Sequence, residues 1–212
     1  VFGGNKDYLC YITNTLLFTF VTTAAKTGLG LLLAVMLSEG IWLKNFHRSM
    51  MYLPSVLPVL VTGLTFTSIL NPKLGFLNTF LRGIGLDALA QKWLVDPKIA
   101  FFSVMGVDTW RGTGYIMTLL IAGILAIPDV YFEAAAIDGA NGWQRFRYIT
   151  LPMLRQTLAV VIVLSVIYGL KVFDIIYALT NGGPMNAAVP EGVSVNEKMI
   201  QYGILAVEME SA

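Results

Sequence analysis

The sequence predicts an all-α integral membrane protein, a polytopic helical bundle with about four transmembrane helices. Hydrophobic residues make up 56% of the 212 residues, charged residues make up only 13%, and the mean hydropathy is +0.71. This balance lies outside the usual range for a soluble domain. The apolar residues also fall in long blocks, whereas a soluble core would distribute them at helical or strand spacing. The chain is therefore expected to cross a lipid bilayer several times.

The composition also argues against several functional classes. The formal net charge is +1 and no cluster of Lys and Arg occurs, so nucleic acid is not expected as a partner. Cys10 is the single cysteine, which rules out a disulfide framework and a cysteine-based metal site. His47 is the single histidine, which argues against a zinc centre and against a Ser-His-Asp or Cys-His triad. We expect no catalytic residues, no bound metal and no enzymatic activity.

The first expected transmembrane helix covers residues 8–37 and carries one stripe of small and polar side chains. The stripe repeats every fourth residue and consists of Thr22, Lys26, Gly30, Ala34 and Ser38. In lipid, small residues of this kind let two helix backbones approach closely, so we expect the stripe to pack against another helix. Two interpretations of Lys26 remain open. Its charge either snorkels or pairs within the bundle, or it lines a pathway.

The second and third expected helices cover residues 50–70 and 101–127. Pro54 and Pro58 lie four residues apart near the start of the second, which predicts a kink there. In the third, Asp108 and Arg111 lie three residues apart on one helix face, and we expect them to pair with each other. Three glycines of the third helix are expected to allow close helix contact: Gly112, Gly114 and Gly123.

The fourth expected helix covers residues 153–180, and its second half is less apolar than its first. Lys171, Asp174, Ala178 and Asn181 follow one another at spacings of three and four, so a continuous helix would place them on one face. Two interpretations remain open here as well. Either Lys171 and Asp174 neutralise each other in the bundle, or the shared face lines a substrate path.

The connections between these helices differ in length and character. The segment at 71–100 begins with the turn signal Asn-Pro-Lys-Leu-Gly, and a short amphipathic helix is expected at residues 76–82. Four spans place the connections at 38–50 and 128–152 on one side of the membrane and the 71–100 connection on the other. Five basic residues against four do not decide which side is cytoplasmic.

A polar segment of about twenty residues, 131–152, separates the third and fourth expected helices; we call it the island. Residues 131–137 are expected to form a short helix, and Asp138-Gly139 a turn, because glycine accepts positive φ. A second short helix is expected at 142–148, carrying Trp143 and Phe146 beside arginines. This helix–turn–helix at the membrane face is suited to fill a pocket in a partner. The alternative is an interfacial helix that lies on lipid.

The island resembles the EAA–G–I-LP signature of permease subunits from binding-protein-dependent ABC importers. The positions that match are Glu133-Ala134-Ala135, Gly139, Ile149 and Leu151-Pro152. Further segments resemble the sugar-type permeases of the maltose and glycerol-phosphate group. They are Asn14-Thr15, Trp93-Leu94-Val95-Asp96-Pro97, Trp110-Arg111-Gly112, Phe173-Asp174 and Thr180-Asn181-Gly182-Gly183-Pro184. The resemblance covers roughly residues 2–184.

The resemblance implies a multi-pass protein of a bacterial or archaeal plasma membrane with the island on the cytoplasmic side. It implies that the island docks in a groove of an ABC ATPase subunit, which uses ATP and Mg while this chain binds no cofactor directly. The implied interface residues are Glu133, Ala134, Ala135, Asp138, Gly139, Trp143, Phe146, Ile149, Leu151 and Pro152. The other implied partners are a second permease subunit and an extracytoplasmic solute-binding protein that faces the 71–100 connection.

For the solute, the resemblance implies a sugar or a sugar-like compound. The candidate translocation path consists of the charged and polar residues of the expected helices: Lys26, Asp108, Arg111, Lys171, Asp174 and Asn181. Two other hypotheses stay open. A secondary transporter or channel would use five of these residues, all but Asn181, as an ion path, and a truncated or chimeric remnant would transport nothing.

The extent of the permease part is a further expectation. Residues 1–186 are assigned to a permease transmembrane domain that lacks one span at each end, since permeases of this group have a further helix before and after. Residues 187–212 are expected to be a tail outside the membrane. Its last eleven residues resemble the ribose-binding strand of bacterial purine nucleoside phosphorylases, in which a pair like Met209-Glu210 contacts the nucleoside sugar. We expect a chimera joined near 186–196, with a divergent exposed tail as the alternative.

Overall fold

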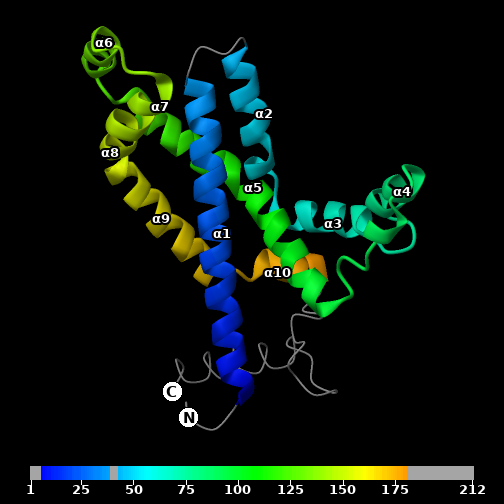
Figure 1. The fold of residues 1–212 in the computed structure, drawn as a ribbon. Helices are drawn as coiled ribbons and strands as arrows, with labels where there is room; N and C mark the ends of the chain where they lie inside the picture. Colours follow the sequence, from blue (N-terminus) through cyan, green and yellow to red (C-terminus); the bar gives the residue numbers. More distant parts are fainter. Residues whose placement is uncertain (1–5, 39–42, 181–212) are drawn as a thin grey trace, which may run out of the picture. The chain divides into compact units, whose positions relative to one another are not determined.

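The computed structural model describes residues 6–38 and 43–180, and within these ranges all regular structure is helical (Figure 1). The helices are α1 (Lys6–Ser38), α2 (Lys44–Val56), α3 (Val59–Ile69), α4 (Phe76–Gly83), η1 (Asp87–Leu89), α5 (Pro97–Leu125), α6 (Asp129–Ile137), α7 (Gly142–Arg145), η2 (Phe146–Thr150), α8 (Leu151–Met153), α9 (Arg155–Leu170) and α10 (Asp174–Thr180). The expected all-α class is confirmed. The path residue Asn181 and the tail at 187–212 lie outside the described residues.

The described chain divides into two compact units. One unit contains residues 58–107 and 172–180 with the start of α1, and the other contains residues 16–57 and 108–171. The first unit thus holds α3, α4 and α10, and the second holds α2, α6 to α9 and most of α1. The chain passes from one unit to the other within α1 and within α5.

Within the described ranges, one helix is by itself long and apolar enough to cross a membrane: residues 12–38 of α1. The number rises to four if each of three bent helix pairs counts as one span. The pairs are α2 with α3, α5 with α6, and the helical run 142–153 with α9, bent by 95°, 69° and 66°. The expected number of about four transmembrane helices is therefore reached when each bent pair is counted as one span.

The kink expected at Pro54 and Pro58 is confirmed, and it is sharp enough to end one helix and begin another. Pro54 lies buried inside α2, and Pro58 is the residue before α3. Since proline lacks the backbone N–H that would continue the hydrogen-bond ladder, the chain turns at Leu57-Pro58 with extended backbone angles.

The expectation of one continuous helix over 153–180 is wrong. α9 ends at Leu170, Lys171 is its C-terminal cap residue, and α10 begins at Asp174. In the first unit α10 packs against α3, where Gly63 meets Ala178 so closely that a Cβ at Gly63 would overlap the Ala178 Cβ. Because the helix is broken between Leu170 and Asp174, Lys171 and Asp174 do not share a helix face.

The connection at 71–100 is held together by one buried amide. Asn78 of α4 is 2% exposed; its Nδ2 donates to the carbonyl oxygens of Pro72 (3.2 Å) and Gln91 (2.9 Å). The indole Nε1 of Trp93 donates to Asn78 Oδ1 at 2.7 Å. These bonds join three parts of the connection, and α4 confirms the short helix expected there. A segment too short to bury a large apolar core is thus ordered by a satisfied polar centre.

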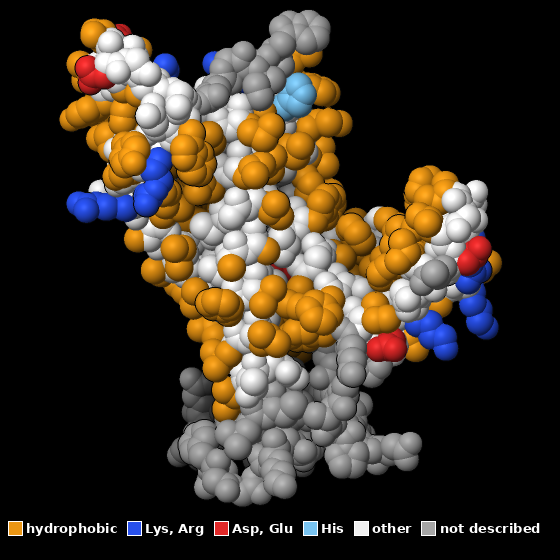
Figure 2. Space-filling view, viewed as in Figure 1, with side chains coloured by type: hydrophobic (Ala, Val, Ile, Leu, Met, Phe, Trp, Pro, Cys, Tyr) orange, Lys and Arg blue, Asp and Glu red, His pale blue; other side chains and the backbone are white. Residues whose placement is uncertain are grey.

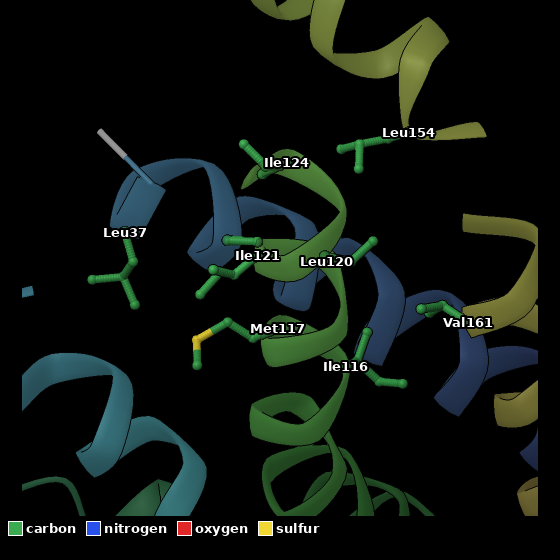
Figure 3. Close-up of a cluster of buried hydrophobic side chains, with 9 residues drawn as sticks. Leu37, Ile116, Met117, Leu120, Ile121, Ile124, Leu154 and Val161 are labelled. Carbon is green, nitrogen blue, oxygen red and sulfur yellow. The ribbon is translucent and has the colours of Figure 1, made fainter. Parts of the chain in front are cut away.

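The core of the second unit forms where α1, α5 and the start of α9 meet (Figure 3). Its buried side chains are Ala34, Leu37, Ile116, Met117, Leu120, Ile121, Ile124, Leu154 and Val161. The stripe expected on α1 is confirmed as a packing face over four of its five residues, since Thr22, Lys26, Gly30 and Ala34 are buried, while Ser38 is partly buried. A Cβ added at Gly30 would lie 2.8 Å from Ile116 Cγ2, so the missing side chain sets the close approach of the two helices.

The three glycines expected to allow close contact in α5 each face a different neighbour. Gly112 lies against the side chain of Lys26, Gly114 against the backbone of Met51, and Gly123 against Thr157. The expectation is confirmed. In the same unit, the C-terminal end of α1, the start of α2 and the island lie at one end (Figure 1), as the predicted topology requires.

The outward faces of the helices are strongly apolar. Large hydrophobic side chains stand exposed along them, among them Phe20 (73%), Leu64 (70%) and Tyr168 (67%). Figure 2 shows hydrophobic side chains spread over the helices, with charged ones gathered at the island and around α4. Exposed apolar area on this scale is typical of a surface that faces lipid or protein.

Substitution of Gly114 by alanine tests the close contact between α5 and α2. The added Cβ would overlap the backbone of Met51, which cannot move aside as a flexible side chain can. We expect a loss of about 1–3 kcal/mol, the usual cost of overpacking, seen as a lower melting temperature in detergent. Gly106→Ala on the same helix is the matched control, because nothing lies within 4 Å of its added Cβ. Equal melting temperatures for the two variants would contradict the contact.

Candidate functional site

The island folds as the expected helix–turn–helix, and its turns are fixed by local contacts. α6 ends at Ile137, and Gly139 takes a φ of +73°, which glycine adopts without steric cost. Asn141 then caps α7 in a reciprocal pair of hydrogen bonds. Its Oδ1 accepts from the Gln144 N–H at 2.9 Å, while Gln144 Oε1 accepts from the Asn141 N–H at 2.8 Å. This capping box was not anticipated, although Asn-x-x-Gln is a readable signal for it.

The second helix of the island is longer than expected. The expected segment was 142–148, whereas helical backbone continues to Met153 through a π-helical turn at Phe146–Thr150. Single π turns occur often at functional sites because they re-aim the side chains that they carry. The run bends by 66° into α9, and α6 bends by 69° away from α5. Both island helices are therefore turned away from the long helices that flank them.

The island presents an exposed surface that combines aromatic, small and acidic side chains. Trp143 is 70% exposed, Tyr148 75% and Ile137 88%. The rings of Trp143 and Phe146 lie 5.5 Å apart, and Arg145 Nε donates to the Ala140 carbonyl oxygen at 3.0 Å, which ties the second helix to the turn. Of the ten residues that the signature singles out, six are exposed: Glu133, Ala134, Asp138, Gly139, Trp143 and Pro152. Ala135, Phe146, Ile149 and Leu151 are partly buried.

A second candidate site lies inside the second unit, at a buried ion pair. Lys26 Nζ of α1 lies 2.5 Å from Asp108 Oδ2 of α5, and the two side chains are 9% and 11% exposed. The expected pair between Asp108 and Arg111 is therefore wrong. Gly112 explains the difference, since a Cβ there would lie 2.8 Å from Lys26 Cε. Because Gly112 has no side chain, Lys26 can lie across α5. Its ammonium group, and not the Arg111 guanidinium, pairs with the Asp108 carboxylate.

The ion pair borders a cavity of about 140 Å³. Its lining consists of Lys26, Tyr52, Ser55, Asp108, Arg111, Gly112, Tyr115, Ile116, Leu164, Ser165 and Tyr168. The structure thus brings together three of the six residues proposed for a path. Five hydroxyl-bearing residues were missed, although Ser165 and Tyr168, three apart in an apolar helix, form a readable polar face.

Of the other three residues of the candidate path, Lys171 is absent from the cavity lining, Asp174 belongs to the first unit, and Asn181 lies outside the described residues. Lys171 is exposed at the end of α9 and Asp174 is exposed at the start of α10. For Lys26, the pairing interpretation is confirmed, and the same residue also borders the cavity.

These features define a class of protein, a polytopic helical membrane protein with an exposed helix–turn–helix between two of its apolar helices. The family model described as "Binding-protein-dependent transport system inner membrane component" matches residues 26–207. The chain belongs to this family. The resemblance to sugar-type ABC permeases is confirmed at this level, while the assignment of residues 187–212 stays a prediction.

The similar proteins agree with the family. Over 173 residues, 82% of this chain, it is 39% identical to the trehalose/maltose transport system permease MalF of Thermococcus litoralis and covers 58% of that protein. It is 34% identical to the sn-glycerol-3-phosphate transport system permease UgpA of Agrobacterium fabrum, over 87% of this chain and 62% of that one. The chain spans about 60% of the length of the curated relatives that it matches first.

A solved structure shows the same fold. It is a bacterial alginate ABC transporter in complex with alginate pentasaccharide-bound periplasmic protein, with a TM-score of 0.76 and 27% identity. The match covers 83% of this chain and 62% of that one.

Removal of one partner of the buried ion pair is expected to destabilise the protein. Asp108→Ala leaves the Lys26 ammonium buried without a counter-charge, which costs about 3 kcal/mol at similar sites. We expect a clear fall in the melting temperature of the purified protein in detergent. The double variant Lys26→Met/Asp108→Leu, which removes both charges, is expected to recover most of the loss. A double variant no more stable than Asp108→Ala would contradict a pairing role.

Proposed function

We propose that the chain is the permease subunit of an ATP-driven importer and forms the path of a sugar or sugar-like solute across the membrane. Family membership supports the transport role, and the functions of two similar permeases, trehalose/maltose transport and sn-glycerol-3-phosphate transport, support the solute class. The observation that carries the proposal is the island: an exposed helix–turn–helix, bent away from the flanking helices, with the EAA signature on it.

The island is suited to transmit force to and from an ATPase subunit. Its shape is set by its own contacts, the capping box and the bond from Arg145 to Ala140, so it can act as a rigid body. Its exposed Trp143 offers an aromatic anchor for a groove, and Glu133 and Asp138 offer charges that align the contact. By the family analogy this end is cytoplasmic, and the partners are ABC ATPase subunits and a second permease.

At the other membrane face, the connection at 71–100 would meet a solute-binding protein. The hydrogen bonds around Asn78 support this role, because they give the connection a defined surface. The solute would pass by way of the cavity at Lys26, Asp108 and Arg111. Because Lys26 and Asp108 compensate each other, these two residues offer no free charge to an ion, and the ion path of a secondary transporter has less support.

Substitutions on the island test the coupling role. In the assembled importer, Glu133→Lys and Gly139→Asp are each expected to lower ATP-dependent solute uptake in proteoliposomes at least tenfold. ATP hydrolysis by the partner subunits should continue, and the amount of this chain in the membrane should be unchanged. The reason is that both positions are exposed and, among the described residues, nothing lies within 4 Å of a Cβ at Gly139.

A strain control separates a partner contact from a backbone effect. Gly85 also has a positive φ, +79°, with nothing within 4 Å of an added Cβ. Gly85→Asp is therefore expected to carry the same backbone strain, about 1 kcal/mol, and the same change in melting temperature as Gly139→Asp. Normal solute uptake by both Glu133→Lys and Gly139→Asp would contradict the coupling role. Uptake that needs no ATPase subunit and collapses with the proton or sodium gradient would instead support a secondary transporter.

A further inference from the structure

The charges around the cavity do not balance. Two cations, Lys26 and Arg111, and one anion, Asp108, line it. Lys26 and Asp108 lie 2.5 Å apart and compensate each other. Among the described residues Arg111 has no ion pair within 4.0 Å, although Asp108 lies only three residues away on the same helix. One positive charge is therefore left over, and it belongs to a guanidinium.

Two hydrogen-bond donors of the cavity are also without partners in the described chain. Arg111 Nε on α5 is buried and makes no hydrogen bond. Ser165 on α9 is 4% exposed, and its Oγ makes none either. Buried donors of this kind are costly unless something accepts from them. The two residues come from different helices, α5 and α9, and both belong to the lining of one cavity.

We propose that this cavity selects solutes that carry an anionic group, a carboxylate or a phosphate, and that Arg111 is the residue that selects for charge. The proposal rests on the proposed function, which makes the cavity part of a solute path. The planar fork of a guanidinium matches the oxygens of a carboxylate or phosphate, and charge-assisted bonds are about twice as strong as neutral ones. Ser165 Oγ supplies a second donor to the same group.

A neutral polyol does not satisfy the cavity in the same way. Its hydroxyl groups can accept from Arg111 and Ser165, but they bring no charge to compensate the guanidinium. A partly buried cation without a counter-charge is unfavourable at membrane depth, where polar surroundings are scarce. Asp108 supplies no second counter-charge, because its carboxylate is engaged with Lys26.

Matched probes test the charge preference directly. The full-length protein in lipid nanodiscs, without ATP, would be titrated calorimetrically with glucuronate against glucose, and with sn-glycerol 3-phosphate against glycerol. At constant ionic strength we expect at least one charged probe to bind about tenfold to hundredfold more tightly than its neutral match. Preference in one pair alone identifies which anion the cavity takes.

Variants of the cavity assign the preference to its residues. Arg111→Gln keeps hydrogen-bonding capacity without charge, so it should reduce the ratio of affinities to about one. Arg111→Lys should keep most of the ratio, and Ser165→Ala should weaken the charged probe roughly two- to tenfold without a change in net charge. Arg155→Gln is the matched control, since Arg155 is exposed and is not in the cavity lining. The Ser165 and Arg111→Lys variants keep the test decisive if Arg111→Gln does not fold.

Several outcomes would overturn the proposal. Equal affinity for charged and neutral probes would do so, as would a preference that survives Arg111→Gln or binding of none of the four probes. Failure of the proposed function shows itself separately, in uptake. A charge preference without ATP-dependent uptake would remove the importer role and leave the anion site, whereas ATP-dependent uptake without a preference would remove only the charge selection.

Discussion

Close approach of helix backbones at residues without bulky side chains is the constraint on which the second unit depends. α5 touches a different neighbour at each of three glycines: α1 at Gly112, α2 at Gly114 and the start of α9 at Gly123. In lipid the outward faces gain little by leaving their surroundings, so association relies on close packing and on polar contacts between helices. The glycines of α5 allow that close packing. Gly30 of α1 does the same from the other side, because its missing side chain lets α1 approach Ile116 of α5.

The same constraint places the buried ion pair beside the cavity. Because Gly112 has no side chain, Lys26 can lie against α5 and place its ammonium at the Asp108 carboxylate. Two charges buried without each other would cost far more than the pair does. The pairing stabilises the contact of α1 with α5 and at the same time leaves Arg111 as the uncompensated charge of the lining. The helix packing and the charge that we propose to select the solute therefore both depend on one glycine position.

The island differs from the helical bundle, because its conformation depends on contacts between residues that lie within about a dozen positions of one another in the sequence. Gly139 sets the turn, Asn141 and Gln144 cap each other, and Arg145 ties the second helix to Ala140. An element built in this way keeps its shape when its surroundings move. Since its large side chains, such as Trp143, are exposed rather than packed, its contribution to function must come from what binds it. That division, a bundle stabilised by its interior and an island stabilised by its own contacts, is consistent with the coupling role that we propose for the island.

The sequence by itself determined the helical class, the break at Pro58, the packing stripe of α1 and the helix–turn–helix of the island. Each of these depends on a local property: hydropathy, a missing N–H, a missing side chain, or the positive φ that glycine accepts. Only the tertiary structure decided that Asp108 pairs with Lys26, 82 residues away, rather than with Arg111 on its own helix. Only the tertiary structure separated Lys171 from Asp174, through the packing of α10 on α3. Both depend on how one helix lies against another, and no periodicity within a single helix encodes that.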